Sequence, residues 1–346
     1  MPEVMKAVIK EKPGAGAIYG DKPIPQIGPD DVLVRVRAAS ICGTDLHIYK
    51  WDAWAAGRVK PPIIMGHEIC GEVAERGINV KALKIGDFVS LESHIVCNTC
   101  RYCRTGNGHI CENTRLIGVD RDGGFSEYIA IPAQNAWPNP PDMPLDIAVL
   151  MENFGNAVHT AFACDLSAKK VLVTGCGPVG LMTIAVAKAI GARAVYATDI
   201  SDYRVDFAKK MGADLALNAN KDDVISQIKE ATDGEGVDVL LEMSGSPQAI
   251  DQAFKLLKPG GEAALLGVAG KPFEFDWDHH LVFKAATVHG ISGRRLWQTW
   301  YQARGLIFSR AVDLSPLVTH HVSLAEFDQA FSSMASGESG KVIMTP

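Results

Sequence analysis

Four cysteines lie close enough along the chain to bind a single metal ion. Cys97, Cys100, Cys103 and Cys111 follow the pattern C-x2-C-x2-C-x7-C. Four thiolates in a tetrahedral arrangement are a ligand set that structural zinc prefers. Two disulfides would fit a secreted protein, and bacterial ferredoxin runs usually place a proline after the last cysteine, where this chain has Glu112. The spacing therefore favours a closed structural zinc site over both alternatives.

A glycine-rich turn is the second candidate for chemistry. It follows an apolar run at 171–175 and opens a helix-like run at 179–192, and it reads G-x-G-x-x-G. In that context the first glycine makes a tight turn, the second lets the backbone approach a pyrophosphate, and the third allows close helix packing. Free N–H groups at the helix start would bind the phosphates. The residues predicted to contact a dinucleotide here are Gly175, Gly177, Val179 and Gly180.

An acidic residue in the next strand predicts which dinucleotide is bound. Asp199 ends an apolar run at 194–199. A carboxylate there accepts hydrogen bonds from the adenosine ribose and repels a 2′-phosphate, which favours NAD over NADP. Arg204 could instead accept a 2′-phosphate, but with Asp199 present we interpret it as packing over the adenine or contacting the ribose. A helix-capping or surface role is the alternative for Asp199.

A third set of residues offers sulfur, nitrogen and carboxylate ligands. Cys42 lies in ICGTDLH, His67 and Glu68 lie in GHE, and Glu152 lies in LMENFG. A catalytic zinc is held by three such protein ligands and keeps one open position. Spacing alone makes this only a hypothesis, because a lone cysteine or histidine in such segments is more often structural.

The elements that must position these residues differ between the two halves of the chain. Before residue 155, short β-like runs alternate with Pro- and Gly-rich turns, which predicts a mostly antiparallel β domain. From 171 onward strands alternate with helices, which predicts a parallel, doubly wound sheet. The expected strands are 7–10, 32–38, 71–77, 87–93, 171–175, 194–199, 214–218, 237–245, 261–267, 286–292 and 342–344, and the clearest helices are 179–192 and 201–213.

Composition excludes some classes of protein. The 346 residues are 47% hydrophobic and 21% charged, with a net charge of −6, which disfavours a general nucleic-acid binder. The first residues lack the apolar core of a signal peptide, and no uncharged apolar run is long enough to span a bilayer. Eight cysteines in such a chain suit a reducing compartment, so we expect a cytoplasmic protein. Cys70, Cys164 and Cys176 are interpreted as small buried residues.

The order of these motifs resembles the zinc-dependent medium-chain alcohol dehydrogenases. CGTD–H, GHE, the four-cysteine run and GxGxxG occur in the family's order, and the resemblance covers essentially the whole chain. It implies a GroES-like catalytic domain at 1–154, to which 297–346 return, and a Rossmann NAD-binding domain at 155–296. It also implies one catalytic and one structural zinc per subunit, NAD as cofactor, and a homotetramer.

The resemblance implies roles for the third set of residues. Cys42, His67 and Glu152 become metal ligands, and Glu68 resembles a carboxylate that can approach or exchange on the zinc. Thr44 and His47 would relay the substrate proton to solvent. Without the resemblance, a turn hydroxyl and a surface histidine are the simpler interpretations of those two. Glu152 could also be a relay carboxylate or a partner for a substrate ammonium group.

More cofactor contacts follow from the expected carboxyl edge of the sheet. Ligands bind at that edge in doubly wound sheets. The resemblance implies that backbone at the ends of two strands contacts the nicotinamide half. The residues concerned are Leu266, Gly267, Val268, Ile291 and Ser292.

Longer stretches at 41–55, 94–100, 155–160 and 293–301 narrow the resemblance to one activity. It is the oxidation of L-threonine by NAD+ to L-2-amino-3-oxobutyrate and NADH. Asn153 departs from the pattern, since a proline is expected after the glutamate in what we take to be a loop, and Arg295 is also unusual.

The substrate contacts are less defined. The ammonium and carboxylate groups of an amino acid need polar partners. The candidates are His94, His159, Arg294 and Arg295. A polyol or 2,3-butanediol dehydrogenase of the same fold, and a non-catalytic NAD-binding protein, are the rival interpretations.

Overall fold

The structure is a computed structural model that describes residues 3–346, and these form two compact units. The first unit joins the chain up to Asn153 with Leu317–Pro346, and the second comprises Phe154–Pro316. The return to the first unit therefore begins later than the predicted residue 297. Residues 297–316, including helix α9 (Gln298–Phe308), group with the second unit instead.

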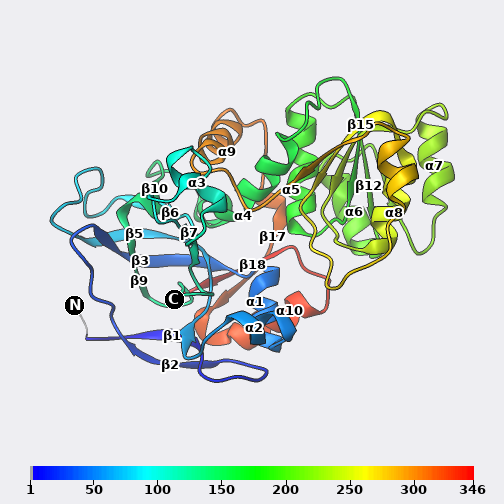
Figure 1. The fold of residues 1–346 in the computed structure, drawn as a ribbon. Helices are drawn as coiled ribbons and strands as arrows, with labels where there is room; N and C mark the ends of the chain where they lie inside the picture. Colours follow the sequence, from blue (N-terminus) through cyan, green and yellow to red (C-terminus); the bar gives the residue numbers. More distant parts are fainter. Residues whose placement is uncertain (1–2) are drawn as a thin grey trace. The chain divides into compact units, whose positions relative to one another are not determined.

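The first unit is built mainly on a seven-stranded sheet whose pairs are largely antiparallel (Figure 1). Its strand order is β10-β6-β5-β3-β18-β17, with β9 also paired to β3. Only β17 and β18 run parallel. These strands are β3 (Asp31–Ser40), β5 (Glu68–Arg76), β6 (Phe88–Leu91), β9 (Tyr128–Pro132), β10 (Ala136–Pro138), β17 (Val318–Ser323) and β18 (Lys341–Thr345).

Smaller elements complete the first unit. A three-stranded sheet has the order β2-β1-β4, and β7 pairs with β8. The strands are β1 (Val4–Lys10), β2 (Ile18–Pro23), β4 (Ile63–Ile64), β7 (His94–Ile95) and β8 (Arg115–Leu116). The helices are α1 (Gly43–Lys50), α2 (Ala53–Arg58), α3 (Arg101–Arg104) and α10 (Phe327–Ala335), while α4 (Leu145–Ala161) begins here and continues past Asn153.

The core of the first unit explains why β3 is its central strand. Val32, Val34 and Val36 are all buried on one face of the strand, and Leu33 is buried on the other face. That period of two places one face of the strand against the core. Phe125 and Phe331 pack in the same core. Burial of such side chains stabilises the fold by roughly 1.5–3 kcal/mol each.

The second unit contains a six-stranded sheet, β13-β12-β11-β14-β15-β16, in which every pair is parallel. Strand order reverses between β11 and β14, the position where such sheets bind ligands beyond their carboxyl ends. The predicted parallel, doubly wound sheet is confirmed. The strands are β11 (Lys170–Thr174), β12 (Ala194–Asp199), β13 (Leu215–Asn218), β14 (Val237–Glu242), β15 (Leu257–Leu265) and β16 (Thr287–Gly290).

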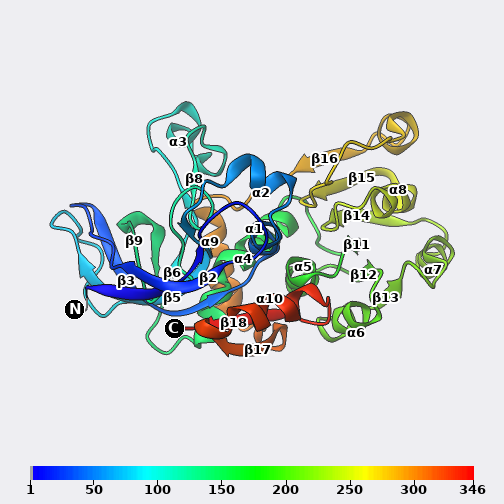
Figure 2. The same ribbon diagram turned by 90° about the horizontal axis from the view of Figure 1, so that it is seen from below.

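Helices cover both faces of this sheet. Figure 2 shows α5 and α6 on one side, where they contact β11, β12 and β13. On the other side, α8 contacts β11, β14 and β15, and its Phe254 packs with Leu172, Leu240 and Ala263. The helices are α5 (Pro178–Ala189), α6 (Asp202–Lys210), α7 (Val224–Ala231) and α8 (Pro247–Leu256). Among residues 3–346, no helix combines the length and apolar character needed to cross a bilayer.

Candidate functional site

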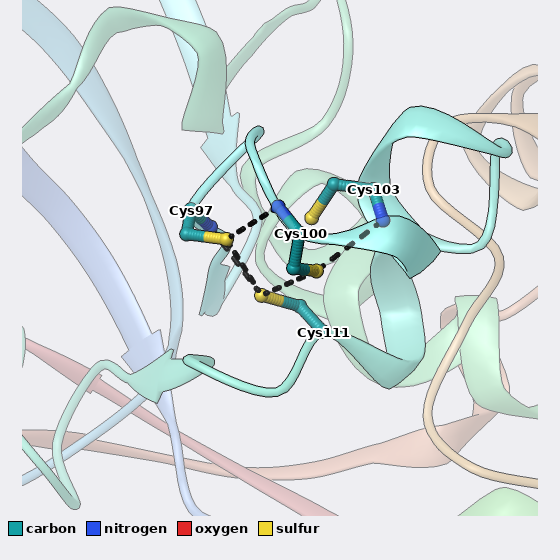
Figure 3. Close-up of side chains that lie close together, drawn as sticks. All are labelled: Cys97, Cys100, Cys103 and Cys111. Carbon is teal, nitrogen blue, oxygen red and sulfur yellow. Dashed lines mark hydrogen bonds between the residues drawn. The ribbon is translucent and has the colours of Figure 1, made fainter.

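The four cysteines of the first unit converge as their spacing predicts (Figure 3). Cys100 caps α3, Cys103 lies inside that helix, and Cys97 and Cys111 approach from the flanking loops. The Cys111 sulfur is 3.5 Å from that of Cys97 and 3.9 Å from that of Cys100. Four sulfurs bound to one zinc at 2.3 Å would stand about 3.8 Å apart. All eight cysteines are free thiols, so the disulfide alternative is rejected and the sulfur arrangement fits zinc.

Backbone N–H groups prepare these sulfurs to carry negative charge. The Cys100 N–H donates to the Cys97 sulfur at 3.3 Å, and the Asn113 N–H donates to the Cys111 sulfur at 3.3 Å. Hydrogen bonds from Thr99, and then from Cys100 and Asn113, lower the pKa of Cys97 to about 5. Burial, followed by the neighbouring thiols, raises the pKa of Cys103 to about 12. A cation would be needed to hold all four as thiolates.

A second group of ligands forms in the first unit around Cys42. Cys42, His67 and Glu68 each offer one ligand atom, and these atoms lie within 4.8 Å of one another. Cys42 is the N-cap of α1, and His67 and Glu68 enter β5. The turn before them requires Gly66, because its φ is +91° and a Cβ would lie 2.1 Å from the Phe125 ring. The structure thus assembles three of the four predicted ligands of the catalytic zinc.

Buried polar atoms in this group support a cation between its members. Glu68 Oε1 is buried without a hydrogen-bond partner in the described part of the chain, whereas His67 Nδ1 and Asp45 Oδ1, which also lack one, face each other. Uncompensated polar atoms are costly inside a protein, and a bound cation would satisfy ligand atoms of this kind. The arrangement therefore fits the zinc that the sequence predicts.

Asp45 is a site residue that the sequence reasoning missed. It is fully buried, its Oδ2 accepts the Cys42 N–H at 2.9 Å, and its Oδ1 lies 3.4 Å from His67 Nδ1. Burial acts to lower the pKa of His67, but Asp45, followed by Cys42, outweighs it and holds that pKa well above its usual range. The signal was present in the sequence, because Cys42 and Asp45 have the spacing of a capping box.

Glu68 is bound on one side by residues of two other strands of the same sheet, β3 and β18. Its Oε2 accepts hydrogen bonds from the Lys341 ammonium and the Ser40 hydroxyl, and all three side chains are buried. Lys341 Nζ also donates to the Ile41 carbonyl at 3.0 Å. One carboxylate oxygen is therefore fixed, and the other is buried without a hydrogen-bond partner among the described residues.

Glu152 and Asn153 lie in the middle of helix α4 and not in the expected loop. Glu152 Oε1 accepts the Ser93 hydroxyl at 2.5 Å, and Glu152 is not part of the group formed by Cys42, His67 and Glu68. Its role as a ligand stays a prediction. The side-chain amide of Asn153 points at the Cys42 sulfur, with Nδ2 at 4.0 Å. The expected proline could not make that contact.

The two predicted proton-relay residues share one helix. Thr44 is half-buried in the first turn of α1, and His47 follows three residues later on the same side. The His47 side chain is 60% exposed, and its Nδ1 is 2.5 Å from Asp52 Oδ2. A carboxylate that faces Nδ1 favours the tautomer with the hydrogen on Nδ1, which leaves Nε2 as the acceptor. The helix thus leads from a half-buried hydroxyl to a histidine in contact with solvent.

The glycine turn of the second unit has the predicted geometry. Gly175 has a φ of +84°, and a Cβ there would lie 2.9 Å from Ser244. Gly177 caps α5, and Pro178 begins that helix. A Cβ on Gly180 would lie 1.9 Å from the Gly175 carbonyl. Only glycine allows this close packing of helix and strand, which leaves the N–H groups at the helix start free to face a phosphate.

Asp199 stands at the end of β12, beside the glycine turn. Its Oδ2 accepts the Cys176 N–H at 2.7 Å and its Oδ1 accepts the Ser201 N–H at 3.0 Å. Arg204 Nη1 is 3.9 Å from Asp199 Oδ2. The two side chains thus lie together. This position is compatible with Arg204 contacting the adenine or ribose and with Arg204 accepting a 2′-phosphate. Asp199 also holds the turn itself, which the sequence did not indicate.

The other predicted cofactor residues gather at the carboxyl ends of β14, β15 and β16. The Leu266 and Gly267 N–H groups donate to the Glu242 carbonyl at 2.9 and 3.1 Å. The Ile291 N–H donates to the Leu265 carbonyl at 2.9 Å, and Ser292 follows it. Val268 is 88% exposed. These positions share one edge of the sheet with the glycine turn.

The four candidate substrate contacts fall into different environments. His94 is half-buried, with Nδ1 3.0 Å from Glu92 Oε1. His159 Nδ1 donates to the Gly293 carbonyl at 2.9 Å. Arg294 is 1% exposed and donates to Asn156 Oδ1 at 3.3 Å, whereas Arg295 is exposed. His159 and Arg294 thus connect α4 with the segment after β16. This structural role accounts for the presence of both side chains, and their contact with substrate stays a prediction.

Comparison with known proteins agrees with this arrangement. Residues 28–141 match the family model described as the alcohol dehydrogenase GroES-like domain, and residues 178–309 match the zinc-binding dehydrogenase model. An L-threonine 3-dehydrogenase from Symbiobacterium thermophilum is 50% identical over 100% of this chain and 99% of its own length.

Solved structures share the fold across both units. An enzyme from Escherichia coli CFT073, described as a short chain alcohol dehydrogenase and crystallised with NADH, has a TM-score of 0.92, 26% identity and full coverage of both chains. The 2R,3R-butanediol dehydrogenase of Bacillus subtilis has a TM-score of 0.90 and 28% identity over 99% of each chain.

Proposed function

The chain belongs to the zinc-dependent medium-chain alcohol dehydrogenases, and we propose that it oxidises L-threonine to L-2-amino-3-oxobutyrate with NAD+. One observation supports this most directly. The chain is 50% identical to an L-threonine 3-dehydrogenase, and its fold places ligand atoms of Cys42, His67 and Glu68 within 4.8 Å of one another. The rival of a non-catalytic NAD-binding protein is disfavoured, because such a protein has no need of this arrangement.

Cys42 and His67 would hold the catalytic zinc, with Glu152 as the predicted third ligand and Glu68 as a carboxylate able to approach. Zinc in such a site acts as a Lewis acid that lowers the pKa of a substrate hydroxyl. The chain positions the ligands through Asp45, which contacts the His67 ring and caps the helix that begins after Cys42. Lys341 limits the movement of Glu68 by binding one of its two oxygens.

The proton of the substrate hydroxyl would leave along helix α1. Thr44 Oγ1 can accept and donate in turn, and His47 Nε2 can accept because Asp52 faces Nδ1. The exposure of His47 then lets water take the proton from the ring. If Thr44 were only a turn hydroxyl and His47 only a surface histidine, the proton would lack this route to solvent.

The second unit would bind NAD+, which accepts the hydride from the substrate carbon. The turn from Gly175 to Gly180 offers backbone N–H groups to the pyrophosphate. Asp199 would accept hydrogen bonds from the adenosine ribose, and its charge would oppose a 2′-phosphate. Backbone at Leu266–Val268 and at Ile291 and Ser292 would contact the nicotinamide half, since these residues lie at the carboxyl edge of the same sheet.

We also propose that the enzyme is a cytoplasmic homotetramer. Strand β16 forms one end of the parallel sheet, and Val282, Phe283 and Val288 near it are exposed apolar residues. An edge strand with exposed apolar residues is commonly buried in a subunit interface, and a second copy of the chain could form that interface. Free thiols at all eight cysteines suit a reducing compartment. Light scattering on the purified enzyme tests the oligomeric state.

A substrate comparison tests the proposed reaction. NADH formation should be measured with L-threonine, 2R,3R-butanediol and sorbitol, using the zinc-loaded enzyme and a Cys42→Ala variant. We expect the highest kcat/KM with L-threonine and its loss in the variant, with NAD+ binding retained. A higher kcat/KM with butanediol or sorbitol would contradict the substrate, and an active Cys42→Ala enzyme would contradict the site.

A further inference from the structure

A third group of metal-binding side chains lies within the second unit. Cys164, Glu262 and His289 each offer one ligand atom, and the three atoms lie within 4.8 Å of one another. Cys164 follows helix α4, Glu262 is in β15 and His289 is in β16. None of the three has a part in the proposed reaction.

The sheet register explains why the last two side chains meet. Ala264 pairs with His289 across parallel strands, and Glu262 is two residues before Ala264. Side chains two apart on a strand share a face, so Glu262 and His289 project from the same face of the sheet. Ala263 packs on the opposite face with α8, which leaves the face of Glu262 for Cys164 and Lys169.

The contact between Glu262 and His289 has the spacing of two ligands on one ion. His289 Nε2 lies 3.4 Å from Glu262 Oε2, yet it is buried and makes no hydrogen bond within residues 3–346. Nitrogen and oxygen bound to one zinc at about 2.1 Å also stand roughly 3.4 Å apart. A cation between them would satisfy the ring nitrogen, which the protein alone leaves unpaired.

The charges around the three side chains define what a bound cation would change. Lys169 Nζ binds Glu262 Oε1 at 3.1 Å, which leaves Oε2 facing His289. Burial, followed by the Glu262 charge, raises the pKa of the Cys164 thiol to about 12. Binding a metal would release that proton, since the thiolate is the ligand form, and the thiolate and carboxylate would then neutralise the ion.

We propose that Cys164, Glu262 and His289 form a third zinc site, with one position open to water. One sulfur, one nitrogen and one oxygen donor suit zinc better than the hard cations calcium and magnesium. The ion would tie the segment after α4 to β15 and to the edge strand β16. Because the side chains project from one face, backbone pairing along the outer edge of β16 would remain possible.

Zinc counting on the full-length protein tests the proposal. Wild type, His289→Gln and Cys164→Ala are incubated with excess zinc chloride, desalted and analysed by plasma mass spectrometry. His279→Gln is the matched control, since this exposed histidine of the same unit forms its ion pair with Asp276, away from the three ligands. We expect both site variants to hold one zinc per chain fewer than wild type and the control, with unchanged turnover of L-threonine.

A crystal of the wild type measured at the zinc absorption edge gives a second readout. We expect an anomalous peak among Cys164, Glu262 and His289 that is absent in His289→Gln. Equal zinc contents in the wild type and both site variants would overturn the proposal, and so would an anomalous map without a peak at this position. His289 is partly exposed on an edge strand, so its variant should fold even if Cys164→Ala does not.

Discussion

Lys341, in the last strand of the chain, forms a buried ion pair with Glu68, next to His67 of the candidate zinc site. The Lys341 side chain is 1% exposed and that of Glu68 is fully buried. Lys341 thus compensates a carboxylate that would otherwise carry an isolated charge in the interior. Its ammonium also binds the Ile41 carbonyl, just before Cys42. The C-terminal strand therefore bears directly on the geometry of the site.

We expect Lys341→Met to destabilise the enzyme strongly, because it leaves the Glu68 charge buried and unpaired. Loss of one partner of a buried pair costs ~3–5 kcal/mol. The change should appear as a lower thermal unfolding temperature and a lower denaturant midpoint. In the Lys341→Met/Glu68→Gln double variant the charge is gone, so much of the stability should return. Equal stability of the single and double variants would show that the lost charge pairing is not the cause.

Asp45→Asn tests whether Asp45 orients His67. The amide can still accept the Cys42 N–H, but it loses the charge that faces the ring. Such outer partners of metal-bound histidines contribute roughly 10- to 100-fold to metal affinity or activity. We expect a drop of that size in catalytic zinc affinity, measured by competition with a chelator. Asp206→Asn, at an exposed ion pair with Lys209, is the control and should bind zinc as wild type does.

The parts of the site that the sequence predicts are those whose geometry is set locally. The four cysteines lie within one short segment, 97–111, so their spacing determines which thiols can bind one ion. The glycine turn is shorter still, 175–180, and the positions of its glycines determine its shape. The parallel sheet was equally predictable, because buried strands such as β11 are continuous apolar runs.

Long-range pairings explain what the sequence did not reveal. Lys341 and Glu68 are 273 residues apart, and nothing near Lys341 indicates its partner. Cys164 resembles any small buried residue until β15 and β16 bring Glu262 and His289 beside it. Asn153 likewise gains its meaning only when α4 places its amide against Cys42.

Chelation should separate the two predicted zinc sites of the first unit. The site of Cys42 and His67 keeps an open position, whereas four cysteines enclose the other, so the open site should lose zinc first. With a chelator, we expect loss of NADH formation before any change in circular dichroism. Cys103→Ser should instead lower the unfolding temperature, by on the order of 5 °C. Simultaneous loss of activity and structure would argue against two separate sites.

Asp199→Asn should weaken the preference for NAD over NADP. The variant keeps an oxygen for the Cys176 N–H but loses the charge that favours ribose hydroxyls over a phosphate. Hydrogen bonds to a charged acceptor contribute ~1.5–3 kcal/mol, so we expect roughly a 10- to 100-fold loss in kcat/KM for NAD. Asp214→Asn, at the surface salt bridge with Lys188, is the control. An unchanged ratio of kcat/KM for the two cofactors would remove Asp199 from the ribose site.

Protonation of the buried His159 ring should lower the stability of the enzyme in mild acid relative to neutral pH. Burial, together with Arg295 and Arg294, lowers the pKa of His159 below its usual value of about 6.5, although its bond to the Gly293 carbonyl opposes this. The unfolded chain then binds the proton more readily than the folded chain. The stability due to the neutral ring is therefore present above pH 6.5 and decreases as the pH falls toward the folded-state pKa.

The variant His159→Asn removes this titration while keeping a donor for the Gly293 carbonyl. We expect the unfolding temperature of the wild type to fall more than that of the variant between pH 7.5 and pH 5.5. Acid also weakens zinc binding, but that effect is common to both proteins and cancels in the comparison. His279→Asn, at an exposed histidine, should follow the wild type. If wild type and His159→Asn lost stability in parallel, the neutral ring of His159 would not contribute to the acid sensitivity of the fold.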